Sequence, residues 1–249
     1  MKHTLLILAV LTVVIGACSA VAQVQTDSLT AHEVLDRVNT AWQGDSFHGI
    51  VSLDVVLGEQ TKSHRLEIWT LGEELALVRV LAPEVDADSG YLQLGNQLWY
   101  YAPSIGAIEL PAVAIGDALF GAGPSLEDLS HGTLSDDYDV SSVLTEQGYA
   151  LTLIPRADTP VVYGRLEISV TRDFLIESLV YYDQRGDVLQ TATFADVTEF
   201  DGRKLATTIT IEDAFGDRTV EHIELAQFDL ELDASFFQLE TFETWRSEP

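Results

Sequence analysis

The chain has 249 residues, with 40 Asp and Glu against 13 Lys and Arg, and its formal net charge is −27. This length is sufficient for a buried core and fits one large β domain or two small ones. A surface of that charge repels phosphate backbones and anionic headgroups, which argues against nucleic acid and against a basic membrane footprint. Solubility alone would also account for such acidity.

Residues 1–22 have the pattern of an export signal, with Lys2 before an apolar run and small residues after it. The run, Leu5 to Ile15, is too short to cross a bilayer core of about 30 Å. Ile15-Gly16-Ala17-Cys18 fits a lipobox, in which Cys18 carries a lipid, whereas Ala20-Val21-Ala22 fits ordinary cleavage after residue 22. Both alternatives predict an extracytoplasmic, periplasmic protein, and lipidation of Cys18 would anchor it to a membrane. Cys18 is the one cysteine of the chain, so no intramolecular disulfide can form.

After a short linker, residues 23–29, the segment Thr30 to Trp42 is predicted to be an amphipathic helix. Thr30 and Glu33 have the spacing of a capping box, and apolar residues recur at helical intervals. The apolar face either covers a core permanently or forms a mobile lid. Its lid-forming residues would be Leu35, Val38 and Trp42.

From Phe47 the apolar period changes to two, which predicts half-buried antiparallel strands. Segments 62–71 and 74–81 are expected to form a hairpin with Gly72-Glu73 as a two-residue loop. In that register Ile68 pairs with Leu77 and Leu66 pairs with Arg79. One face would then carry Leu66, Ile68, Leu75, Leu77, Leu81 and Arg79.

Arg79 is the most informative polar residue of this hairpin, because a guanidinium on an apolar face needs an anion or water. It could hold a headgroup or a lid carbonyl at a cavity mouth. The alternative is an arginine that reaches outward or pairs with a nearby Asp or Glu.

The next predicted hairpin, Gly90 to Leu94 and Gln97 to Ala102, turns at Gly95-Asn96 and is rich in aromatic residues. Wide, rigid side chains could line a slot for an extended apolar ligand, or they could simply fill the core of a β protein. The aromatic residues in question are Tyr91, Trp99, Tyr100 and Tyr101.

Between Pro111 and Ser135 the alternation stops, and small apolar residues and glycines replace it. Because this insertion is too apolar to lie in water, we expect it to fold against the opening of the sheet as a second part of the lid. Its predicted anchors are Leu119, Phe120 and Leu126.

Seven further strand patterns run from Tyr138 to Leu232, separated by turn sequences and by no linker. The predicted fold is therefore mainly β (α+β): residues 30–240 form one large curved antiparallel sheet, an incomplete barrel of about eleven strands with helices on its concave side. Asp233 to Leu239 would close the domain with Phe236 and Phe237 packed inward, and residues 241–249 would be a tail.

Sequence signatures of catalysis and of metal or cofactor binding are not found. The six histidines lack metal-ligand spacing, and there is no nucleophile elbow, P-loop or dinucleotide fingerprint. The pattern Asp136-Asp137-x-Asp139 lacks the glycine and distal glutamate of a calcium loop. We therefore expect no cofactor, no metal and no catalytic residue, and we favour binding over catalysis.

The order of these parts resembles the LolA-like family of outer membrane lipoprotein-sorting proteins. The likeness covers about Thr30 to Leu239 and is carried by two groups of motifs. The first is W-T-x-G, L-V-R-V, A-P and G-Y-L-Q-L-G-N-Q-L-W-Y-Y-A-P, and the second is S-L-E-D-L-S-H-G-T-L-S-D-D-Y-D-V with Y-A-L-T-L-I-P and R-L-E-I-S-V.

The resemblance implies an incomplete β barrel with helices as a lid over an apolar cavity that takes the acyl chains of a lipoprotein. It also implies transfer from an inner-membrane transporter to an outer-membrane acceptor of the same fold. The family's carrier has a basic lid-holding residue in the strand where this chain reads Ile68-Trp69-Thr70-Leu71, so Arg79 is only a neighbour of that position. A lipid on Cys18 would favour an anchored acceptor or lipid-handling module over a free shuttle.

The first hypothesis is thus a non-enzymatic, monomeric protein that binds lipid or lipoprotein acyl chains and acts in their transfer to the outer membrane. The second is a sensing or accessory module that binds an envelope membrane protein, and a third, an enzyme, would need a polar cleft with paired carboxylates. The predicted cavity-lining residues are Leu66, Ile68, Leu75, Leu77, Arg79, Tyr91, Trp99 and Tyr101.

Overall fold

The computed structural model describes residues 29–42, 44–72, 74–111, 137–157 and 163–244, apart from the side chains of Trp42 and Glu243. The export signal with Cys18 and the predicted flap anchors Leu119, Phe120 and Leu126 lie outside these ranges, as does the side chain of Trp42. No described helix is both long and apolar enough to span a bilayer.

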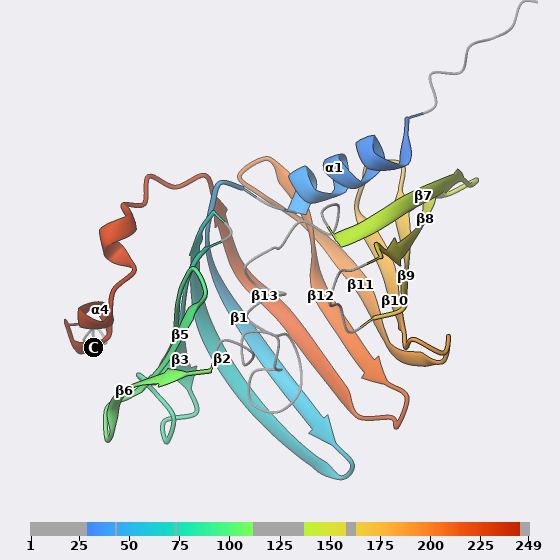
Figure 1. Ribbon diagram of the computed structural model, residues 1–249. Coiled ribbons are helices and arrows are strands. Elements are labelled where there is room, and N and C mark those ends of the chain that lie inside the picture. Colours follow the sequence, from blue (N-terminus) through green and yellow to red (C-terminus); the bar gives the residue numbers. More distant parts are fainter. Residues whose placement is uncertain (1–28, 43, 73, 112–136, 158–162, 245–249) are drawn as a thin grey trace, which may run out of the picture.

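Thirteen antiparallel strands form one continuous, curved, open sheet (Figure 1). In the first half of the chain they are β1 (Ser46–Leu57), β2 (Gln60–Leu71), β3 (Leu75–Ala82), β4 (Gly90–Leu94), β5 (Gln97–Ala102) and β6 (Gly106–Leu110). In the second half they are β7 (Tyr138–Leu144), β8 (Gly148–Pro155), β9 (Arg165–Thr171), β10 (Ile176–Tyr182), β11 (Val188–Phe200), β12 (Arg203–Asp213) and β13 (Arg218–Phe228).

The sheet order is β6-β5-β4-β3-β2-β1-β13-β12-β11-β10-β9-β8-β7. Strands β1 and β13 therefore pair in the middle of the sheet, while β6 and β7, which follow each other in sequence, form its two edges. The predicted mainly β, incomplete-barrel fold is confirmed, with thirteen strands in place of about eleven. β6 is a strand that the sequence patterns did not predict.

Irregular pairing helps to bend this sheet. The register of β1 and β13 shifts between Ile50 and Val51, because Ile50 pairs with Leu225 and Val51 pairs with Ile223, which leaves Glu224 of β13 as an extra residue. An extra residue in one strand bends that strand and increases its local twist. Such bends allow thirteen strands to curl without closing.

Three described helices complete the fold: α1 (Ala31–Trp42), the 3-10 helix η3 (Ala234–Phe236) and α4 (Leu239–Thr244). In Figure 1, α1 lies over the half of the sheet that contains β7–β12, whereas α4 lies beyond β3 and β5 at the other end. We call the face covered by α1 the inner, concave face and the opposite one the outer face. The residues from 241 onward, predicted to be a tail, include the last turn of α4.

The β2–β3 hairpin has a different register from the predicted one. Three residues, 72–74, join the strands, so Leu71 pairs with Leu75 and Ile68 pairs with Val78 rather than with Leu77. A shift of one residue moves every side chain of a strand to the opposite face. The predicted common face of Leu66, Ile68, Leu75, Leu77 and Arg79 is therefore wrong.

Candidate functional site: the inner face under α1

The inner face at β1–β6, β12 and β13 is a largely apolar wall. Paired residues of neighbouring strands share a face, and the chain of pairs Ile68–Val78, Val78–Tyr91 and Tyr91–Tyr100 crosses this wall. Its buried members are Val51, Leu66, Ile68, Val78, Val80, Leu98, Leu205, Ile209, Ile223 and Ala226.

The wall ends in an aromatic rim on β4–β6. The rings of Tyr91 and Tyr100 lie 5.2 Å apart between centroids, and Ile108, the partner of Tyr100 on β6, is 46% exposed. Burial raises the pKa of the Tyr91 hydroxyl above its usual range. This end of the inner face thus combines an apolar surface with access to solvent.

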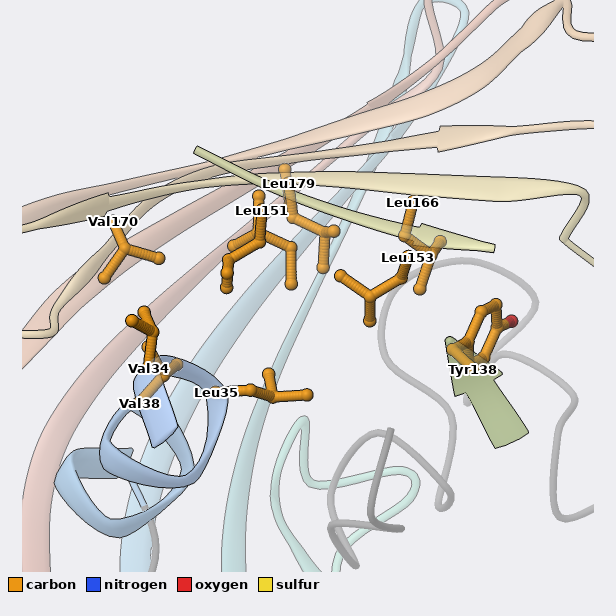
Figure 2. Close-up of a cluster of buried hydrophobic side chains, with 11 residues drawn as sticks. Val34, Leu35, Val38, Tyr138, Leu151, Leu153, Leu166, Val170 and Leu179 are labelled. Atoms are coloured by element: carbon orange, nitrogen blue, oxygen red, sulfur yellow. The ribbon is translucent and has the colours of Figure 1, made fainter. Parts of the chain in front are cut away.

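Under α1 the inner face is sealed by direct packing. Figure 2 shows Val34, Leu35 and Val38 of α1 directed toward the side chains of the sheet. Val34 and Leu35 are 0% exposed and Val38 is 3% exposed. Their partners are Tyr138, Leu151, Leu153, Leu166, Ile168, Val170, Leu179 and Ala192.

Phe194 of β11 and Ile211 of β12 pack against both the wall and the cluster under α1, so the two are parts of one inner surface. Exposing a buried aliphatic side chain costs about 1.5–3 kcal/mol. Lifting α1 would uncover three of them, so the buried contacts of α1 favour its position on the sheet.

The N-terminus of α1 is fixed by the predicted capping box, which is confirmed. The backbone N–H of Thr30 donates to Glu33 Oε2 at 2.7 Å, and the N–H of Glu33 donates to Thr30 Oγ1 at 3.2 Å. The bond that the Glu33 carboxyl accepts from the Thr30 N–H, and a second that it accepts from the Thr30 hydroxyl at 2.8 Å, hold the pKa of Glu33 below its usual value.

This capping box predicts an acid-sensitive helix start. A carboxyl whose folded pKa is lowered contributes stability above its unfolded pKa, and that contribution is lost as pH falls through the folded value. We expect Glu33→Gln to remove part of the loss of stability between pH 5 and pH 3, measured by urea unfolding at each pH. Equal pH slopes in the variant and the wild type would contradict the assignment.

The C-terminus of α1 is held by Arg203 of β12. Its guanidinium donates to the Thr40 carbonyl at 3.2 Å, forms an ion pair with Asp229, and lies 5.0 Å from the centroid of the Phe228 ring. Asp229 Oδ1 in turn accepts from the Asp45 N–H at 3.0 Å. Arg203 therefore links the end of α1 to Asp229, which follows β13, and through Asp229 to Asp45, which precedes β1.

Replacing Arg203 with Met should loosen this end of α1 while keeping an apolar stem over Phe228. The loss of a donor to a carbonyl at the helix end should accelerate amide hydrogen exchange in residues 38–41 about tenfold, since a hydrogen bond to a charged group contributes roughly 1.5 kcal/mol. Arg218→Met, on the next strand, is the matched control. Unchanged exchange at the end of α1 would show that Arg203 does not hold it.

The outer face carries a second apolar core that belongs to the C-terminal segment. Phe237 and Phe242 are buried there against Trp69, Leu77 and Leu92. Phe236 and Phe237 do pack against the sheet, as predicted, but against its outer face. Leu71, Leu75, Leu94, Trp99, Tyr101, Leu232, Phe236 and Leu239 surround this core.

Five of the eight predicted cavity-lining residues thus lie on the outer face: Leu75, Leu77, Arg79, Trp99 and Tyr101. Leu66, Ile68 and Tyr91 lie on the inner face. The shifted register of the β2–β3 hairpin places Leu75, Leu77 and Arg79 on the outer face. Trp99 and Tyr101 lie there because side chains alternate along β5 and Tyr100, between them, is on the inner face. The register error also hid Val78 and Val80, which lie on the inner face once 72–74 are taken as the loop. Tyr100 was missed because its neighbours Trp99 and Tyr101, on the opposite face of β5, were chosen instead.

Arg79 does not reach the inner face. It is 5% exposed, and its Nε donates to Asp88 Oδ1 at 3.1 Å. Asp88 is held in the loop after β3 by its own N–H, which donates to the Val80 carbonyl at 3.0 Å. The alternative in which Arg79 pairs with a nearby Asp is therefore confirmed, and the residue supports a loop instead of a cargo headgroup.

An open, curved antiparallel sheet with a helix across its inner face is the fold of LolA-like proteins. Three solved structures share this fold. A LolA superfamily protein from Nitrosomonas europaea is 20% identical, with a TM-score of 0.70 over 85% of this chain and 98% of that one. A putative outer membrane lipoprotein-sorting protein domain from Vibrio parahaemolyticus is 16% identical, with a TM-score of 0.72 over 85% and 97%. A DUF1329 family protein from Desulfovibrio piger is 17% identical, with a TM-score of 0.75 over 85% and 97%.

The family itself follows from the sequence. A family model described as "uncharacterized protein" matches residues 72–244, more than half of the chain, and the chain belongs to that family. None of the curated proteins matches the sequence.

Proposed function

We propose that this protein binds acyl chains of lipids or lipoproteins on its inner face, outside the cytoplasm, and acts in their transfer toward the outer membrane. The observation that carries the proposal is one apolar surface, from the rim at Ile108 to the cluster under α1, that faces a helix on an open sheet. Burial of a chain on such a surface contributes about 0.8 kcal/mol per CH₂.

The inner-face residues Leu66, Ile68 and Tyr91 stay in the proposed ligand set, together with Tyr100 and Phe194. Leu35 and Val38 are the parts of the lid that pack on the sheet. Cargo enters when α1 lifts, because the cargo then takes over the contacts that α1 loses. Without such compensation, the opening cost keeps α1 closed.

Two features support binding rather than catalysis. The solved structures of similar fold include a putative lipoprotein-sorting domain. Within the described residues, the inner wall consists mainly of aliphatic and aromatic side chains, and its buried titratable groups include His64 and Glu221 beside Leu53. Transfer by a soluble shuttle or by a form anchored through Cys18 is equally compatible with this wall.

Native mass spectrometry of the mature protein, extracted from its own envelope under mild conditions, tests the proposal. We expect an adduct with the mass of a lipid or an acylated peptide, which delipidation removes and a lipid vesicle of native composition restores. Protein that carries no adduct and takes up no acyl chain from those vesicles would refute it.

A further inference from the structure

The turns between the strands lie at two opposite ends of the sheet. Because neighbouring strands are antiparallel throughout the sheet, the β1–β2, β3–β4, β5–β6, β10–β11 and β12–β13 turns all lie at the end away from α1. Figure 1 shows the β1–β2, β5–β6 and β12–β13 turns at the lower end and α1 at the upper end. We call this end the distal rim, and it consists of residues 58–59, 83–89, 103–105, 183–189 and 214–217.

The distal rim carries apolar side chains that are exposed to solvent. Phe215 is 93% exposed, Val85 is 86% exposed and Ile105 is 59% exposed. Val188 and Leu189 are partly exposed as well. The described residues of the turns at the α1 end include no exposed large apolar side chain, and these turns are 72–74, 95–96, 145–147, 172–175 and 201–202. Among the described turns, exposed apolar residues are therefore a property of one end of the sheet.

Hydrogen bonds fix the backbone that presents Phe215. Asp213 Oδ1 accepts from the Phe215 N–H at 2.8 Å and from the Asp217 N–H at 3.0 Å. The Ala214 N–H donates to the Leu189 carbonyl at 2.9 Å, which joins this turn to the neighbouring hairpin. Phe215 and Leu189 thus belong to one patch, and little backbone freedom remains to be lost when the patch docks.

The loop that presents Val85 is fixed in the same way. The Asp86 N–H donates to the Pro83 carbonyl at 3.0 Å within the loop. At its end, Asp88 accepts from the buried guanidinium of Arg79 at 3.1 Å. The pair of Arg79 and Asp88 therefore holds a loop whose tip is an exposed valine.

The spacing of these apolar tips fits a broad surface better than a single pocket. The β5–β6 and β10–β11 hairpins are roughly 40 Å apart along the sheet, at the usual distance between neighbouring strands. Polar residues separate Ile105, Val85 and the Phe215 patch, whereas a protein interface needs a contiguous, closely packed apolar centre. A lipid bilayer takes up separate apolar side chains one at a time.

The charge of the distal rim indicates which lipids it can approach. Its exposed carboxylates are Glu59, Glu84, Asp86 and Asp187, and its exposed base is Arg185. Lys62 and Arg218 flank two of the turns and leave the carboxylates in excess. Such a rim is repelled by anionic headgroups, in agreement with the net charge of −27, and is compatible with zwitterionic ones.

We propose that the distal rim docks on a zwitterionic lipid surface, into which Phe215, Val85 and Ile105 insert. This orientation places the sheet across the bilayer surface and directs α1 away from it. The inference goes beyond the proposed function, because docking does not require acyl chains on the inner face.

Cosedimentation with phosphatidylcholine vesicles tests the docking. The protein is residues 23–249, the chain that remains after cleavage behind residue 22, so that no lipid on Cys18 can anchor it. We expect binding to these vesicles, and binding at least about threefold weaker when about a third of the lipid is phosphatidylglycerol. A preference for phosphatidylglycerol would overturn the proposal.

Substitutions of exposed residues locate the contact without disturbing a core. Phe215→Ser and Leu189→Ser should each weaken vesicle binding about tenfold, because each removes an apolar side chain that docking buries. Val143→Ser is the matched control: Val143 is 67% exposed, in the edge strand β7. An equal loss for Val143→Ser would overturn the assignment of the rim.

A fluorophore sensitive to polarity measures insertion directly. Residues 23–249 contain no cysteine, so Phe215→Cys or Val143→Cys gives one labelling site. We expect the emission to shift to shorter wavelength on addition of phosphatidylcholine vesicles for the label at position 215 and to stay constant at position 143. A shift at 143 alone, or at neither position, would contradict insertion of the rim.

The remaining outcomes separate docking from other activities. Binding to native envelope membranes but not to vesicles of their extracted lipids would assign the rim to a protein partner and refute lipid docking. Dodecanoate titration measures the proposed acyl binding independently. If dodecanoate binds but vesicles do not, docking is wrong and acyl binding stands; if vesicles bind but dodecanoate does not, the reverse holds.

Discussion

Replacing Leu35 with alanine is expected to destabilise the protein and, at the same time, to increase its affinity for an acyl chain. Leu35 is 0% exposed in the cluster under α1. Truncating a buried leucine lowers the free energy of unfolding by about 2–5 kcal/mol. Urea unfolding with an unchanged m-value would measure this loss.

The gain in affinity follows from the closed lid. With α1 lifted, the contacts of Leu35 are already broken, so the substitution weakens the closed state and spares the open one. A lower opening cost raises the apparent affinity by the same factor as the population of the open state, at least tenfold for a change above about 1.4 kcal/mol. Dodecanoate titration checks this, and an affinity that falls or stays constant would show that ligands enter without α1 moving.

Replacing Phe237 with alanine should destabilise the protein as strongly and leave the affinity unchanged. Phe237 is 3% exposed in the outer-face core with Trp69 and Leu77. Truncation of a buried phenylalanine costs about 3–5 kcal/mol. Because this core lies on the side of the sheet away from α1, the substitution does not change the closed lid.

Leu35→Ala and Phe237→Ala thus form a matched pair in which stability falls in both and affinity rises in one. The same titration, at a temperature where both variants stay folded, makes the comparison. A rise in affinity for Phe237→Ala as well would mean that loss of stability, and not release of α1, controls access.

Alternation and turn sequences predicted most of the strands and the helix α1, because these signals are local. The predicted Val188 to Phe200 strand, for instance, is β11 itself. The assignment of side chains to the two faces of the sheet is less local. It depended on whether the loop after Leu71 has two or three residues, and the third loop residue places Leu77 on the outer face.

The outer core shows a second limit of the sequence patterns. Trp69, Trp99 and Tyr101 are large aromatic residues that could equally line a cavity. Alternation shows that they share one side of the sheet but not which side that is. Their partners, Phe237 and Phe242, come from the far end of the chain, and Phe242 sits on the six-residue helix α4, too short to give a periodic signal. The backbone of Phe174 has a φ of 64°, in the left-handed region. The sequence could not predict this conformation, because no glycine marks the turn there.

The central claim, that acyl chains lie on the inner face, is tested most directly by photocrosslinking from two adjacent positions of β11. Phe194 packs against the apolar clusters of the inner face, and Ala195 is exposed on the outer face. With p-benzoylphenylalanine at position 194, the account predicts that dodecanoate crosslinks to the protein, and that the same group at position 195 gives no product. A crosslink from 195 alone, or none from 194 while dodecanoate remains bound, would contradict it.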